Sequence, residues 1–137
     1  AITPAAGFVL PGSALIIGLI TGAVCFWSAT SLKHMLGYDD SLDAFGVHGV
    51  GGILGALLTG VFAYGPLSAT DANPAGITGS FHQLIIQAEA VGVTILWCGV
   101  ISFVLLKLID ATMGLRVSKE EEQEGLDMSL HGERINI

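Results

Sequence analysis

Three long apolar runs dominate the pattern of the chain. Residues 12–32 and 44–64 contain no Asp, Glu, Lys or Arg, and residues 81–106 contain only Glu89. A helix needs about 20 mostly apolar residues to cross the hydrocarbon core of a membrane, and each run is long enough. The pattern therefore predicts three transmembrane helices.

The segments around these runs divide the chain further. Residues 65–79 combine glycine, proline, serine, threonine, aspartate and asparagine, which is typical of a solvated loop. Residues 1–11 are apolar, contain Pro11 and lack the basic region of a signal peptide. We expect them to be the end of a preceding helix and an external loop of a longer polypeptide. The three helices would then occupy residues 12–115, and a charged tail would follow at 116–137.

Composition favours a lipid environment. Of the 137 residues, 52% are hydrophobic and 12% are charged, whereas soluble domains carry roughly 25% charged residues. The mean hydropathy is +0.72. The net charge of −7 argues against nucleic acid as a partner, because phosphate binding needs a basic face. The predicted fold class is all-α, a polytopic helical membrane protein.

Basic residues set the expected orientation. Lys33 flanks the first connection and the basic residues of 107–119 follow the third helix, whereas residues 65–80 contain none. Cytoplasmic loops of membrane proteins carry an excess of Lys and Arg. We therefore expect the 33–43 loop and the tail on the cytoplasmic side of the membrane and the 65–80 loop outside.

Glycine is abundant, with 19 residues in the chain. Four-residue spacing places Gly18 with Gly22 on the first predicted helix and Gly51 with Gly55 on the second. In a membrane such pairs allow two helices to approach closely, so packing is their expected role. A second helix so rich in glycine is predicted to be central rather than lipid-facing.

His48 is the leading candidate for a functional residue. Polar side chains inside a membrane are costly and usually face the protein interior or a wet cavity. A neutral imidazole donates from one nitrogen and accepts at the other, so it can hold a small polar solute or pass a proton.

The expected surroundings of His48 leave two roles open. At helical spacing its face would include Ala44, Phe45, Gly51, Gly52, Gly55 and Thr59, and the small residues among them leave room for a narrow passage or for a neighbouring helix. A buried His48 would accordingly line a pathway or be hydrogen-bonded structurally. A metal site is not expected, because no second His, Cys or carboxylate follows it at helical spacing.

Carboxylates lie at the start of the second helix and inside the third. Asp40 is expected to cap the second helix with Asp43 in its first turn, although Asp43 could instead attract cations at the helix mouth. Glu89 could be a coupling or proton-binding carboxylate. It could equally bond to a neighbouring helix or lie near the external interface of a long, tilted helix.

The tail changes character abruptly. Ser118 precedes the acidic segment 119–124, and this arrangement predicts a helix capped by the hydroxyl and ended by Gly125. A disordered, solvated terminus is the alternative that the same composition allows.

Three motifs, taken together, resemble Amt-type ammonium transporters. Asp-Asp-Ser-Leu-Asp-Ala-Phe-Gly-Val-His-Gly-Val-Gly-Gly at 39–52 resembles the penultimate helix of that family. Ala-Ile-Thr-Pro-Ala-Ala-Gly at 1–7 is similar to the end of the preceding helix. The tail resembles the cytoplasmic C-terminal region of the family in four segments: Gly-Leu-Arg-Val at 114–117, the glutamates at 120–122, Glu-Gly-Leu-Asp at 124–127 and His-Gly-Glu at 131–133.

The resemblance implies a fragment of an eleven-helix fold that supplies the last three helices of a homotrimer with one pore per subunit. His48 would be the second of two pore histidines, with Asp43 and Ala44 near the cytoplasmic end of the pore. Ammonium would be recruited outside and deprotonated, and ammonia would then cross the cell membrane through a hydrophobic channel.

The resemblance also implies a role for the tail. It would link neighbouring subunits and dock a PII-type nitrogen regulator. The tail residues carried over in this way are Gly114, Arg116, Glu124, Gly125 and Asp127.

Proteins of other classes could share these features. A membrane sensor of ammonium could use the same His48 pocket, and a Rhesus-type gas channel is a closer variant. A structural or proton-translocating subunit of a larger complex would instead use Glu89. An enzyme is not expected and no cofactor is implied, because the sequence shows no nucleophile, paired carboxylates or phosphate loop.

Overall fold

A computed structural model describes residues 1–132, and this part of the chain is helical without a strand. Three of its helices are long and apolar enough to cross a membrane: Pro11–Leu36, Phe45–Phe62 and Phe81–Thr112. The all-α fold class with three membrane-length helices is confirmed. The chain divides into two compact units, Ala1–Thr94 and the part from Ile95 on.

The first long helix has three parts: α2 (Pro11–Trp27), the π-helical turn η1 (Ser28–Leu32) and α3 (Lys33–Leu36). It begins at a proline, whose fixed φ suits the first helical position. It ends one turn beyond the predicted boundary at residue 32, because Gly37 supplies the left-handed backbone (φ 64°) that stops a helix. A wide turn in mid-helix is unusual and is frequent at functional sites.

The second long helix also contains a π-helical turn. It consists of η2 (Phe45–Gly49) followed by α4 (Val50–Phe62). The chain turns extended at Ala63 (ψ 137°), slightly before the predicted end at residue 64. The loop after it is partly ordered, because α5 (Gly65–Ser68) forms within it and the Ile77 N–H donates to the Ser68 hydroxyl at 2.7 Å.

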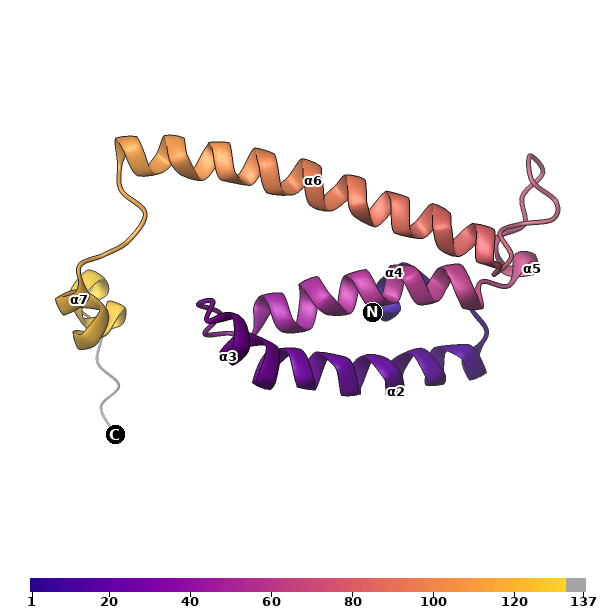
Figure 1. Cartoon of the computed structure of the whole chain (residues 1–137), viewed down its shortest axis with the longest axis horizontal. Coiled ribbons are helices and arrows are strands. Elements are labelled where there is room, and N and C mark those ends of the chain that lie inside the picture. Colours follow the sequence, from indigo (N-terminus) through magenta and orange to yellow (C-terminus); the bar gives the residue numbers. More distant parts are fainter. Residues whose placement is uncertain (133–137) are drawn as a thin grey trace. The chain divides into compact units, whose positions relative to one another are not determined.

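The short helix α1 (Ile2–Ala5) and α2 both pack against α4, so α4 is the central helix of the first unit, as predicted (Figure 1). Ala5 and Ile17 are fully buried between these helices. A glycine also permits the close approach of η2 to η1, because a Cβ added to Gly46 would lie 3.1 Å from the Ala29 Cα.

The third long helix, α6 (Phe81–Thr112), continues beyond the predicted end at residue 106. Lys107 and Asp110 extend it with charged turns, and Gly114 (φ 78°) follows it. Its apolar side chains are outward-facing, as with Trp97, which is 68% exposed. Backbone groups satisfied within a helix and an apolar exterior are the requirements for contact with lipid or with other membrane helices.

Candidate functional site

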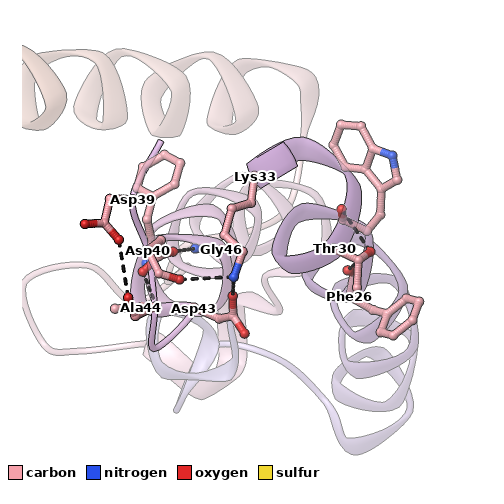
Figure 2. A network of polar contacts seen from close by, with 11 residues as sticks. Phe26, Thr30, Lys33, Asp39, Asp40, Asp43, Ala44 and Gly46 are labelled. Atoms are coloured by element: carbon pink, nitrogen blue, oxygen red, sulfur yellow. Dashed lines mark hydrogen bonds and ion pairs between the residues drawn. The ribbon is translucent and has the colours of Figure 1, made fainter. Parts of the chain in front are cut away.

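A single carboxylate caps the helix that carries His48. The Asp40 carboxylate accepts backbone N–H groups from Ala44 at 2.8 Å, Phe45 at 3.0 Å and Gly46 at 3.2 Å (Figure 2). These are among the first N–H groups of the helix, which have no partner within it. The predicted capping role of Asp40 is confirmed, although the carboxylate reaches further along the chain than a standard cap.

Replacing Asp40 by alanine is expected to weaken the start of this helix. Loss of a capping side chain costs about 0.5–2 kcal/mol, and we expect the upper end because three donors lose their acceptor. The check is hydrogen exchange of the residue 44–46 amides, which should accelerate. Asp71→Ala removes an equal charge from an exposed loop and serves as the control. Equal exchange in both variants would contradict the assignment.

Asp43 does not lie in the first helical turn, contrary to the prediction. It precedes the turn with φ 54°, the only positive φ of a non-glycine residue in the described part of the chain. Its carboxylate pairs instead with Lys33 at 2.5 Å. The prediction missed Lys33 because its partner is ten positions away and the contact requires the chain to reverse. The signal that could have indicated this pair is that Lys33 is the Lys or Arg residue nearest in sequence to the acidic segment 39–43.

His48 lies within η2, and its side chain is exposed rather than buried. Within residues 1–132 the imidazole has no hydrogen bond or ion pair. The described residues therefore offer no partner for the alternative in which His48 is hydrogen-bonded structurally.

The expected face of His48 is only partly right: Ala44 and Phe45 are exposed, as His48 is, but three of its members are not. Gly51, Gly55 and Thr59 are buried, and added Cβ atoms on the two glycines would meet Cys25 or Ala1. A Cβ on Gly52, by contrast, would have nothing within 4 Å. The wide π turn shifts the helical phase, so the buried glycines face α1 and α2 while the imidazole points elsewhere.

The pathway candidates lie close together along one short stretch. Ala44 is exposed and donates its N–H to Asp40, so its contribution is a backbone contact at the helix entrance. An open cavity of about 330 Å³ lies beside this entrance, but neither His48 nor Ala44 lines it. The cavity is lined by Lys33, His34, Gly37, Tyr38, Asp39, Asp40 and Ser41.

Glu89 is separate from these residues. It lies on α6 with its side chain exposed, and no hydrogen bond or ion pair within residues 1–132 joins that side chain to another helix. None of the described residues forms a group of three or more His, Cys, Asp or Glu that could hold a metal ion.

The tail contains the predicted capped helix. In α7 (Lys119–Glu124) the Ser118 hydroxyl accepts the Glu121 N–H, and the Glu121 carboxylate accepts the Ser118 N–H at 2.9 Å. This reciprocal pair is a capping box. Gly125 (φ 98°) ends the helix, so the ordered alternative is confirmed.

The other tail candidates surround α7. Arg116 pairs with Glu122 at 3.2 Å, and both side chains are largely exposed. Asp127 begins the π-helical turn η3 (Asp127–His131). Glu124 is the last residue of α7 and is exposed. The last residue of the His-Gly-Glu segment at 131–133, residue 133, lies outside the described residues.

The tail also encloses a small hollow. It has a volume of about 230 Å³, is more apolar than the cavity beside Lys33, and belongs wholly to the second unit. Its lining comes from Leu115, Arg116, Val117, Glu122 and Leu126.

Acidification is expected to open the capping box. The backbone N–H of Ser118, followed by its hydroxyl, lowers the pKa of the Glu121 carboxyl below its usual 4.5. A lowered pKa in the folded state means that the carboxylate stabilises α7 above pH 4.5 and that this contribution is lost as pH falls through the lowered value. The protection factor of the Ser118 amide, which is its exchange rate normalised to the intrinsic rate at each pH, should therefore fall below pH 4.5.

Two glutamate variants test this assignment. Glu121→Gln should flatten the pH dependence of the protection factor at Ser118, because its amide does not titrate. Glu120→Gln removes a carboxylate that makes no contact with Ser118 and should leave the dependence intact. The same pH profile in both variants would refute the role of Glu121.

Comparison with known proteins places this arrangement in context. Residues 1–135 match the Ammonium Transporter Family. The chain is 48% identical over 138 residues to an ammonium transporter of Bacillus subtilis, covering 98% of this chain and 33% of that protein. It is 40% identical to ammonium transporter Amt1 of Archaeoglobus fulgidus, covering 97% and 33%. The crystal structure of Saccharomyces cerevisiae Mep2 superposes with a TM-score of 0.75 at 38% identity, covering 87% of this chain and 28% of that one.

Proposed function

The chain belongs to the ammonium transporter family, and from that premise we propose that it forms part of a protein that conducts ammonium or ammonia across the cell membrane. It spans about a third of the length of the curated relatives that it matches. With three membrane-length helices, it is a multi-pass membrane protein. The relatives are named as transporters, so the prediction of a protein other than an enzyme is confirmed.

One observation about this chain carries the pathway proposal. The imidazole of His48 is exposed on a helix of a membrane protein and has no partner within residues 1–132. An ionisable side chain in that setting is expected to face a wet cavity or a partner rather than lipid. We assign His48 to the conduction pathway, paired with a second histidine supplied by the rest of the pore.

The remaining pathway residues have supporting roles in this proposal. Ala44 lies at the cytoplasmic end of the pore, beside the capped helix start. Asp43 lies at the same end, with its charge balanced by Lys33. Residues 1–11 form the end of a preceding helix and an external loop, residues 12–115 carry the last three helices of an eleven-helix fold, and residues 116–137 form the tail.

The tail is proposed to face the cytoplasm, to couple subunits of a homotrimer and to dock a PII-type regulator. The ordered α7 and the apolar hollow beside Arg116 support a docking role, because a defined surface recognises a partner at a lower entropic cost than a disordered tail does. Gly114 and Gly125 keep this shape through positive φ values of 78° and 98°, and Glu124 and Asp127 supply exposed charge.

The test is the ammonium-evoked current of the full-length protein in proteoliposomes. We expect a current that depends on ammonium and is absent when sodium replaces it. Ammonia-driven alkalinisation of the vesicles without current would favour a Rhesus-type gas channel. Binding of ammonium with neither current nor alkalinisation would favour a sensor and would overturn the proposed transport.

A further inference from the structure

Lys33 connects the end of the first long helix to the start of the second through two hydrogen bonds. Lys33 of α3 donates to the Asp40 carbonyl oxygen at 3.1 Å and to the Asp43 carboxylate at 2.5 Å (Figure 2). The Lys33 side chain is only 22% exposed. A partly shielded pair is screened less by salt than a fully exposed one, so this contact can hold the loop in place.

The residue that Lys33 holds has an unusual backbone. Asp43 adopts φ 54°, a left-handed conformation that is unfavourable for most residues and less so for Asp or Asn. Its N–H donates to the Asp40 carbonyl at 3.1 Å, and its own carbonyl accepts the Val47 N–H at 2.9 Å. The conformation is thus over-determined by neighbouring contacts, which is how an unfavourable backbone persists.

The direction of the His48 side chain depends on η2, the wide turn that follows Asp43 and contains His48. In η2 the Val50 N–H donates to the Phe45 carbonyl, five residues back. If this wide turn relaxed into an α-helix, one residue would be taken up, which rotates the preceding segment by about 100° relative to α4. Asp43 lies just before this turn, so the backbone conformation of Asp43 affects the direction of the His48 imidazole.

We propose that Lys33 is a positioning residue: by holding Asp43 in its left-handed conformation it maintains the wide turn η2 and thereby the direction of the His48 side chain. The inference rests on the proposed pathway role of His48. Lys33 itself touches no solute and acts through Asp40 and Asp43.

The experiment measures two quantities on the full-length protein: ammonium flux in proteoliposomes and hydrogen exchange of the residue 45–49 amides. Lys33→Met should lower the maximal flux by at least about tenfold, because a small misplacement of a key group can cost up to about a hundredfold. The half-saturating ammonium concentration should change by less than about twofold, since ammonium recruitment lies elsewhere. Exchange at 45–49 should accelerate.

Two further variants separate this role from a general loss of folding. Lys33→Arg keeps the cation and should restore flux and exchange protection. Lys107→Met removes the same kind of charge from α6, where Lys107 lies 6.0 Å from the Phe103 ring, and should behave like wild type. If Lys33→Met fails to fold, Asp43→Asn, which removes the charge paired with Lys33 but keeps a residue that tolerates left-handed backbone, should show the same loss of flux and faster exchange at 45–49.

Several outcomes would overturn the inference. Wild-type flux and wild-type exchange in Lys33→Met would show that the pair is dispensable. Accelerated exchange with full flux would show that η2 does not govern His48. A wild-type protein without any flux would instead overturn the proposed function, and the exchange comparison would still decide whether Lys33 orders this turn.

Discussion

Replacing His48 by alanine is expected to abolish the ammonium-evoked current or to change its ion selectivity, while the protein remains folded. We expect a loss of at least about tenfold, which corresponds to about 1.4 kcal/mol on the barrier to conduction. The reason is chemical: the imidazole can both donate and accept a hydrogen bond to a small polar solute, and a methyl group can do neither. The measurement is current in proteoliposomes across a range of ammonium concentrations.

Stability should separate function from folding in this variant. Because the imidazole of His48 is exposed and unpartnered within residues 1–132, its removal should change the free energy of unfolding by no more than about 0.5 kcal/mol. His82→Ala, at an exposed histidine in the first turn of α6, is the matched control and should retain the current. An unchanged current in His48→Ala would show that His48 does not line the conduction path.

Replacing Gly60 by alanine is expected to destabilise the packing of α4 against the start of α6. The added Cβ would lie 2.9 Å from the Leu84 Cα and 3.1 Å from the Gln83 carbonyl oxygen, and both are backbone atoms that cannot move aside alone. The Ser80 N–H also donates to the Gly60 carbonyl at 3.1 Å, so separating the helices would strain this bond. Overpacking of this kind typically costs about 1–3 kcal/mol.

The matched control lies on the same helix. A Cβ on Gly52 would have nothing within 4 Å in this chain, so Gly52→Ala should be tolerated in a thermal unfolding assay of the detergent-solubilised protein. We expect a lower Tm for Gly60→Ala alone. Equal losses in both variants would show that helix propensity or another contact, rather than the approach to Leu84, is responsible.

Local signals were sufficient for the helices. Hydrophobic length does not depend on partners, so the runs at 12–32, 44–64 and 81–106 predicted three membrane-length helices that the structure contains. Capping is local as well: the Asp40 carboxylate and the Ser118–Glu121 capping box both act within a few residues of their own helix. Helix ends were less predictable, because charged residues such as Lys107 extend a helix as readily as they end it.

The surroundings of His48 were not predictable from local signals. The prediction assumed regular helical spacing and so placed His48 on one face with Gly51 and Gly55. The structure has a π turn at 45–49, and no residue type in that turn predicts it. The phase of the helix changes there, and with it the side of α4 that the imidazole occupies.

The sequence by itself determined that this chain is a helical membrane protein with a histidine in its second long helix and a capped acidic helix in its tail, because hydrophobic length and capping are properties of consecutive residues. Only the tertiary structure decided that Lys33 meets Asp43, that Gly51 and Gly55 face other helices, and that His48 lies uncovered in a wide turn. These features depend on the reversal of the chain between two helices and on the pattern of backbone hydrogen bonds. Neither can be read from the order of apolar and polar residues.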